Sequence, residues 1–138
     1  MRRTSIIVAV VVCLIVVWGV TFTGTPRFGR SIALKEAPVS SIDFSMISRR
    51  EITASNLCAL VLQTMRKARD GGPVHASPPF GILVIHYADG TTNRFDFLPG
   101  HRFNCVDMVD ISGAGMYSVS QSAMFSTLRR VGLMPKGM

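Results

Sequence analysis

The sequence predicts an α+β protein, in which an N-terminal transmembrane helix precedes a small two-layer sandwich. Three observations predict this class: an apolar run opens the chain, two amphipathic helical patterns lie far apart, and alternating patterns with a hairpin signal stand between them. The expected order after the first helix is β-α-β-β-β-β-α, with an antiparallel sheet and both helices on one face. The chain beyond residue 24 is long enough for one modest core and too short for two independent domains.

The N-terminal helix is predicted from an 18-residue apolar run, residues 5–22, behind two arginines. A helix of this length rises about 27 Å, close to the thickness of the hydrocarbon core of a bilayer, about 30 Å. The apolar region of a cleaved secretory signal is shorter, about 7–15 residues. Trp18 and Phe22 suit the membrane interface at the far end. We therefore expect residues 1–24 to be a signal anchor that contacts the lipid bilayer through residues 5–22.

Two other interpretations of this segment remain open: a cleaved signal peptide that releases a secreted domain, and a buried core helix. The charges that flank the run do not decide its orientation, because Arg2 and Arg3 precede it while Arg27, Arg30 and Lys35 follow it. The short basic segment before the run, Arg2-Arg3, does not have to cross the membrane if the N-terminus stays in the cytoplasm. We therefore expect a single-pass membrane protein with its N-terminus in the cytoplasm and its domain on the extracytoplasmic side.

A linker is predicted over residues 25–38, because prolines and glycine interrupt it and no hydrophobic period is sustained. The α+β domain is predicted over residues 39–134. Its first strand begins at Val39, where apolar and polar residues alternate, and the pattern continues towards Ile52.

The first helix of the domain follows this strand. Its apolar positions recur at three- and four-residue steps, and polar residues occupy the other side. Thr53 or Ser55 is the predicted cap at its beginning, and Gly71-Gly72-Pro73 is its predicted end. The apolar stripe consists of Ala54, Leu57, Cys58, Val61, Met65 and Ala68.

A β-hairpin gives the clearest pattern in the chain, because Asp89-Gly90 separates the β-rich segments 80–88 and 91–98. Both turn residues are expected to tolerate positive φ, as tight hairpins require. The first segment is apolar on both faces, which predicts a central position in the sheet.

Two further strands are predicted over residues 105–111 and 116–119, with a glycine-rich turn between them. The last helix is expected to begin at Ser118 or Ser120 and to end before Gly132. This glycine occupies the position after a helix where a left-handed conformation is favoured. Its inner stripe consists of Met124, Phe125, Leu128 and Val131.

No catalytic or metal-binding motif is present among the three histidines, which lack the i, i+4 spacing of a zinc helix. No cofactor and no metal ion are therefore expected. His86 and Asp96 are expected to meet across the hairpin as a hydrogen-bonded pair. An alternative function, a secreted enzyme or enzyme inhibitor, would place its site around His86, Asp96, His101 and Cys105.

The cysteines Cys58 and Cys105 have three interpretations. Each is a small buried hydrophobic residue, or the two form a disulfide in an oxidising compartment, or one is a nucleophile. The last is disfavoured because burial raises the pKa of a thiol. Cys13 lies inside the apolar run and serves there as an apolar residue.

Basic residues gather where the two domain helices end. The formal charge of the chain is +7, and the C-terminal part after Asp110 holds no acidic residue. Cations near helix C-termini complement the helix dipole, which explains their position. If both helices share one face, these cations also form one surface for an anionic lipid, an envelope polymer or a membrane protein. The candidate residues are Arg66, Lys67, Arg69, Arg129 and Arg130.

Nucleic acid is not an expected partner, because exposed aromatic residues do not alternate with these cations. The sequence thus predicts a membrane-anchored, non-enzymatic interaction or accessory module with a basic helical surface, outside the cytoplasm.

Overall fold

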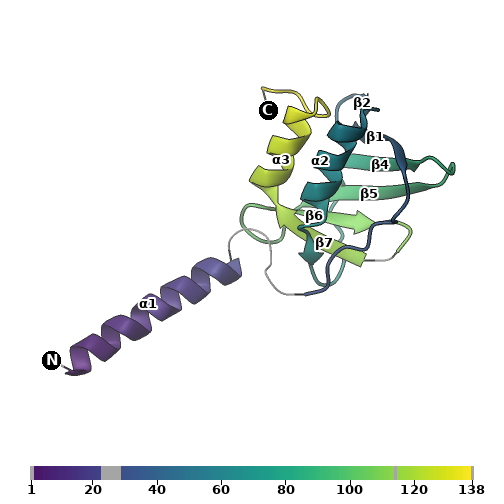
Figure 1. Cartoon of the computed structure of the whole chain (residues 1–138). Helices are drawn as coiled ribbons and strands as arrows, with labels where there is room; N and C mark the ends of the chain where they lie inside the picture. Colours follow the sequence, from purple (N-terminus) through teal and green to yellow (C-terminus); the bar gives the residue numbers. More distant parts are fainter. Residues whose placement is uncertain (1, 23–28, 114, 138) are drawn as a thin grey trace.

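The computed structural model describes residues 2–22, 29–113 and 115–137, with the backbone alone for residues 2–4 and 16–22. It contains three helices and a seven-stranded antiparallel sheet, which confirms the predicted α+β class (Figure 1). The helices are α1 (Arg2–Phe22), α2 (Ser55–Met65) and α3 (Gln121–Arg130).

The sheet has two more strands than the five predicted. Its strand order is β2-β1-β4-β5-β6-β7-β3, and every neighbouring pair is antiparallel. Strand β4 lies between β1 and β5, so its predicted central position is confirmed. The strands are β1 (Val39–Ser45), β2 (Arg49–Ile52), β3 (Arg69–Asp70), β4 (Gly81–Tyr87), β5 (Thr92–Pro99), β6 (Cys105–Asp110) and β7 (Gly115–Ser120).

The first extra strand arises because the chain reverses after Ser45. The prediction of one strand continuing towards Ile52 is wrong: β2 folds back on β1, with Ile52 opposite Ile42. Both isoleucines are buried, so the reversal places two apolar side chains on the same side of the sheet.

The second extra strand arises because α2 ends at Met65, well before the predicted stop at Gly71-Gly72-Pro73. Residues 69–70 instead pair with β7. Gly71 then packs so closely against this strand that a Cβ would lie 2.6 Å from Ser118 Oγ. The residue that precedes α2 is Ala54, which provides no side-chain cap, so the predicted capping by Thr53 or Ser55 is wrong.

The predicted hairpin is confirmed, but its turn differs. Gly90 has φ +86°, while Asp89 does not share this left-handed conformation. The Gly90 N–H donates to the Tyr87 carbonyl, and the Tyr87 N–H donates to that of Thr91. Three residues thus form the loop, and only its last position requires positive φ.

Helices α2 and α3 pack side by side on one face of the sheet and contact each other through the hydroxyls of Thr64 and Thr127, 2.8 Å apart (Figure 1). The N-cap of α3 is Ser120, whose hydroxyl accepts from the Ala123 N–H, and Gly132 has φ +86° beyond its end; both were predicted. The core between the helices and the sheet includes the fully buried residues Phe44, Val61, Met65, Leu83, Ile85, Phe95, Phe97, Met108, Met124 and Leu128.

The segment before β1 packs on the domain and is not a free linker in its described part. Ile32 is 6% exposed and belongs to the core. Ser31 forms a β-bridge with Arg69, and the Asp70 N–H donates to the Arg30 carbonyl. At the other end, Lys35 Nζ donates to Asp89. We refer to residues 29–38 as the strap.

Among the residues that the structure describes, no helix has both the length and the hydropathy of a membrane span. The predicted span, residues 5–22, extends into residues 16–22, whose side chains lie outside the described part.

Candidate functional site

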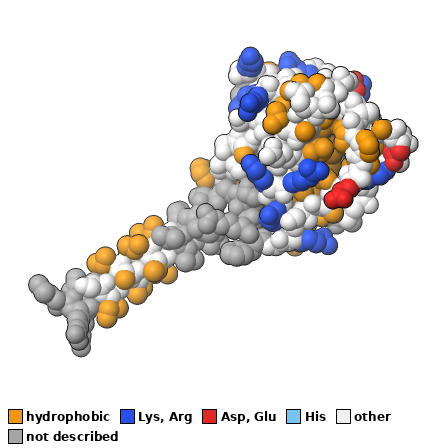
Figure 2. Space-filling view, in the orientation of Figure 1, with side chains coloured by type: hydrophobic (Ala, Val, Ile, Leu, Met, Phe, Trp, Pro, Cys, Tyr) orange, Lys and Arg blue, Asp and Glu red, His pale blue; other side chains and the backbone are white. Residues whose placement is uncertain are grey.

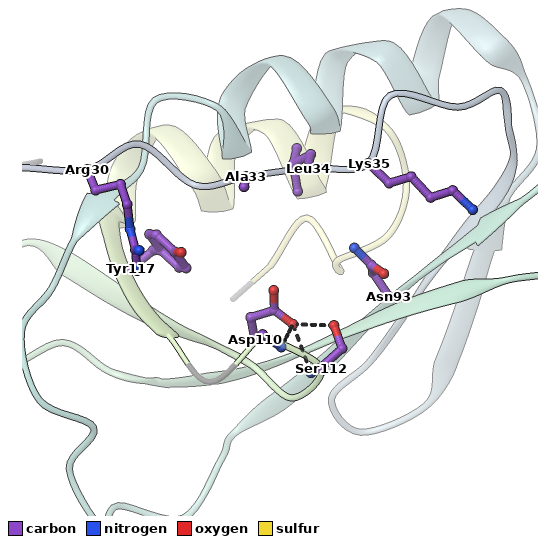
Figure 3. A pocket seen from close by; sticks show the side chains of 9 residues that line it. Arg30, Ala33, Leu34, Lys35, Asn93, Asp110, Ser112 and Tyr117 are labelled. Carbon is purple, nitrogen blue, oxygen red and sulfur yellow. Dashed lines mark hydrogen bonds between the residues drawn. The ribbon is translucent and has the colours of Figure 1, made fainter.

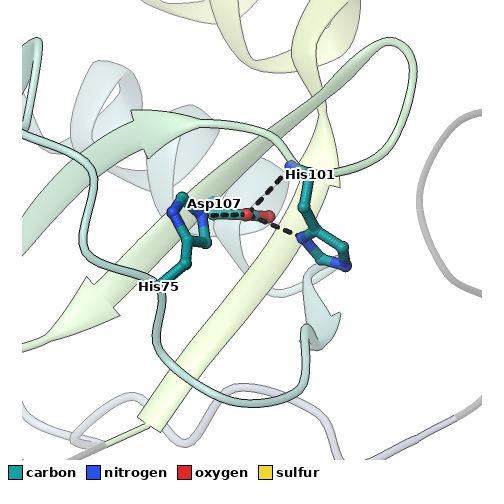
Figure 4. A group of neighbouring side chains, drawn as sticks. All are labelled: His75, His101 and Asp107. Atoms are coloured by element: carbon teal, nitrogen blue, oxygen red, sulfur yellow. Dashed lines mark hydrogen bonds and ion pairs between the residues drawn. The ribbon is translucent and has the colours of Figure 1, made fainter.

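The most concentrated group of titratable side chains surrounds Asp107. Its Oδ2 accepts from His75 Nε2 and from His101 Nδ1, each at 2.8 Å, and from the His101 backbone N–H at 3.1 Å. Its Oδ1 accepts from the Ser118 hydroxyl. Figure 4 shows the two imidazoles on either side of the carboxylate, which has no exposed surface.

The sheet register positions this carboxylate. Successive residues of β6 alternate between faces, so Val106 and Met108 enter the core under the helices while Asp107 points to the opposite face. Its cross-strand neighbours there are Leu98 and Ser118. The Ser118 hydroxyl is therefore adjacent to Asp107 by register alone.

The two histidines come from loops. His101 follows Gly100, where a Cβ would lie 2.0 Å from the Cys105 carbonyl oxygen, so glycine is required for this close approach. His75 lies between α2 and β4, and its second ring nitrogen, Nδ1, is 2.9 Å from Ser77 Oγ. Both ring nitrogens of His75 are thus held.

The environment of Asp107 keeps it ionised. Burial acts to raise the pKa of this carboxyl group, but the hydrogen bonds from Ser118, His101 and His75 outweigh burial and hold the pKa below its usual value. A buried carboxylate with several donors is a stable arrangement. It fastens two loops to the sheet.

The same three residues form a group that can hold a metal ion. Each offers one ligand atom, and these atoms lie within 4.8 Å of one another. Two imidazoles and a carboxylate are a common donor set for Zn²⁺. The rings remain partly accessible, with 28% of the His75 side chain and 37% of the His101 side chain exposed.

A second His–Asp pair lies on the same face of the sheet. His86 Nε2 is 2.6 Å from Asp43 Oδ2, which also accepts from Arg49 at 3.0 Å. The predicted pairing of His86 with Asp96 is wrong: His86 lies opposite Thr92 in the hairpin register, four positions from Asp96 along β5.

The residues of the alternative enzyme or inhibitor site have different partners. His86 pairs with Asp43, Asp96 accepts from Arg94, and His101 pairs with Asp107. In the described part of the chain, these three side chains therefore take part in separate interactions, all on one face of the sheet.

Cys58 and Cys105 are separate buried thiols in the structure, and Cys13 is an exposed one. The Cys58 thiol donates to the Ile52 carbonyl at 3.7 Å. Burial raises the pKa of the Cys58 and Cys105 thiols, which lowers their thiolate fraction at neutral pH.

The basic residues form two groups. Helix α2 leads into β3 at one edge of the sheet, whereas α3 starts after β7, beside that edge, and runs away from it (Figure 1). One group, which we call the tether-side edge, consists of Arg66, Lys67 and Arg69 together with Arg30 of the strap. Arg129 and Arg130 form the other group, at the far end of α3.

A cleft of roughly 480 Å³ lies between the strap and the sheet (Figure 3). Part of its polar lining is engaged within the cleft: Asp110 Oδ1 accepts from the Ser112 hydroxyl and N–H and from the Gly113 N–H. Lys35 binds Asp89 and Thr91.

Comparisons with protein-family models, curated proteins and solved structures find no significant match for this chain.

His75 and Asp107 were missed as site residues by the sequence analysis. The histidines of the group are separated by 26 positions, and His75 lies in a proline-rich loop without a periodic pattern. One signal was available: Asp107 shares its face of the predicted strand with the apolar residues Cys105 and Val109, and a carboxylate buried among such residues needs partners.

Proposed function

We propose that this protein is a membrane-anchored, non-enzymatic interaction module, with α1 as its anchor and its α+β domain outside the cytoplasm. The supporting observation is the apolar surface of α1. Eight large hydrophobic residues between Ile6 and Ile15 are 48–63% exposed, and no charged residue interrupts them (Figure 2). An apolar surface of this extent is unfavourable in water, and a bilayer covers it.

A short connection limits the distance between the domain and the anchor. Six residues separate Phe22 from Gly29, where the strap begins, so these two residues lie within about 25 Å of each other. From Gly29 the chain runs directly along β3. The tether-side edge therefore lies beside the first described residues of the domain, which follow the anchor in sequence.

Anionic lipid headgroups are the partner that this edge fits. Its four basic residues lie on neighbouring backbone segments: the Arg69 guanidinium donates to the Arg66 carbonyl, and the Arg30 carbonyl accepts from the backbone of the residue after Arg69. Each cation near an anionic surface contributes about 1 kcal/mol. The attraction extends over about a Debye length, about 10 Å at 0.1 M salt.

The anchor is tested by paired arginine substitutions. Twelve Ile, Leu, Val and Phe residues between Ile6 and Phe22 favour insertion by about 0.3–0.6 kcal/mol each, and an arginine at the centre costs about 2.5–3.5 kcal/mol. The double substitution Val12→Arg with Ile15→Arg is therefore expected to offset the free energy that favours insertion. The full chain should resist carbonate extraction from membranes, and this double variant should be extracted.

The matched control carries the same two arginines on the domain surface, as Ile47→Arg with Val74→Arg, at positions 83% and 54% exposed. It should resist extraction like the unchanged chain. Intact mass and N-terminal sequencing of the native protein complete the test. A soluble species that begins near Val20 or Thr25 would contradict the anchor and support a secreted domain.

The lipid contact is tested by hydrogen exchange of the full chain in nanodiscs. Backbone amides of residues 66–70 should exchange more slowly in anionic than in zwitterionic lipid. The difference should disappear in about 1 M salt, where the Debye length is about 3 Å. Arg66→Gln with Lys67→Gln should abolish the protection, whereas Arg129→Gln with Arg130→Gln, the same change in charge, should preserve it. Equal effects of the two pairs would refute the assignment of this edge.

A further inference from the structure

The group around Asp107 supports an inference independent of the membrane. We propose that His75, His101 and Asp107 form a binding site for a divalent transition-metal ion, and that Zn²⁺ is the ion the site fits best.

The charge of the site favours a cation. The Asp107 side chain has no exposed surface. Among the residues that the structure describes, its ion-pair partners are the two imidazoles, which carry charge only when protonated, and no Lys or Arg pairs with it. The hydrogen bonds stabilise this carboxylate without a permanent positive charge beside it, and a bound divalent ion would supply that charge.

The donor atoms also converge. Nitrogen atoms from two loops both approach a single oxygen, Asp107 Oδ2, at 2.8 Å. In a tetrahedral zinc site with bonds of about 2.0–2.1 Å, neighbouring ligand atoms lie about 3.3 Å apart. The three atoms lie within 4.8 Å of one another, so small rotations of the two histidine side chains, which lie on loops, would bring them to this arrangement.

The residues behind the ligands have the roles that second-shell groups take in zinc sites. Ser77 Oγ lies 2.9 Å from His75 Nδ1 and would accept a hydrogen bond from the Nδ1–H when Nε2 binds the ion. The Ser118 hydroxyl donates to Asp107 Oδ1, which leaves Oδ2 for the ion. In the metal-bound state His75 carries its ring proton on Nδ1 and His101 on Nε2, so neutral rings change tautomer without a net loss of protons.

The ligands come from three separate segments: the loop between β3 and β4, the turn after β5, and strand β6 itself. A bound ion would therefore connect both loops to the sheet. Three protein ligands leave a fourth position for water, and the partial exposure of both imidazoles gives the ion access.

The experiment uses the full chain in detergent, without an affinity tag and freed of metal by chelation. Titration calorimetry should detect one Zn²⁺ per chain, and Co²⁺ should give the visible absorption of a tetrahedral site. His75→Gln and His101→Gln should each weaken binding by more than about tenfold. Ser77→Ala should weaken it by about tenfold, as loss of a second-shell partner does.

The control is His86→Gln, which removes the third histidine, on the same face of the sheet but bound to Asp43. It should bind Zn²⁺ like the unchanged chain. Circular dichroism of each variant separates loss of binding from loss of the fold. The proposal is overturned if folded His75→Gln and His101→Gln variants keep their affinity, if His86→Gln alone loses it, or if the unchanged chain binds no Zn²⁺.

Discussion

Asp43 shows how a single residue is stabilised on the face of the sheet opposite the helices. Its side chain is 6% exposed and accepts from Arg49 and from His86. Burial acts to raise the pKa of Asp43, and the hydrogen bonds from Arg49 and His86 outweigh it, so the pKa lies below the usual value. The folded state therefore favours the ionised carboxyl group.

A dependence of stability on pH follows from this shift. Because the pKa of Asp43 is lower in the folded chain than in the unfolded one, about 3.9, the pair stabilises the fold above that pH. The stabilisation is lost as the pH falls through the folded pKa. Asp43→Asn should lower the free energy of unfolding by about 2 kcal/mol at pH 7.

Urea unfolding of the unchanged chain and of the Asp43→Asn variant, from about pH 7 down to about pH 2, checks this expectation. The difference in stability between the chains should be constant above about pH 5 and should shrink below about pH 4. A difference that stays the same down to the lowest pH would contradict the assigned role of the ionised carboxylate.

The strap is the segment with which the folded domain begins. Ile32 lies in the core, and the backbone of the strap pairs with β3, the two-residue strand at the edge of the sheet. This edge is thereby covered by another segment of the same chain, which protects it from pairing with other chains.

Ile32→Ala tests the strap. Removal of a buried isoleucine side chain leaves a cavity and should lower the free energy of unfolding by about 2–4 kcal/mol. Ile47→Ala, at a position 83% exposed, is the matched control and should change it by less than about 0.5 kcal/mol. Denaturant unfolding measures both. Equal small effects would mean that the strap contributes no packing.

For the whole molecule, the strap moves the start of the folded unit from Val39 to about Gly29. The Ala88 N–H donates to the Pro38 carbonyl, and Lys35 binds Asp89 at the tip of the hairpin. The strap therefore contacts the sheet at the β3 edge and at the β4–β5 turn.

Two fragments distinguish these boundaries. A chain of residues 29–138 should unfold cooperatively, whereas one of residues 39–138 should be less stable by at least about 3 kcal/mol, since it lacks the Ile32 side chain and the strap hydrogen bonds. Thermal unfolding followed by circular dichroism compares them. Equal stability would restore the boundary at Val39.

The sequence by itself determined the elements whose patterns are local. Two β-rich segments separated by Asp89-Gly90 predicted the central hairpin, and Ser120 and Gly132 marked the limits of α3. Such patterns report interactions within a few residues, so they can be read without knowing the fold. The apolar run at the N-terminus is of the same kind, and its membrane role remains a prediction.

Tertiary structure alone decided the early end of α2, the pairing of β3, the burial of Ile32 and the grouping of His75, His101 and Asp107. Each depends on a contact between segments far apart in sequence: β3 needs β7, and His75 reaches an aspartate 32 positions away. A two-residue strand or a loop histidine has no period of its own. Its structure is determined by the surface that it meets, and that surface exists only when the sheet is formed.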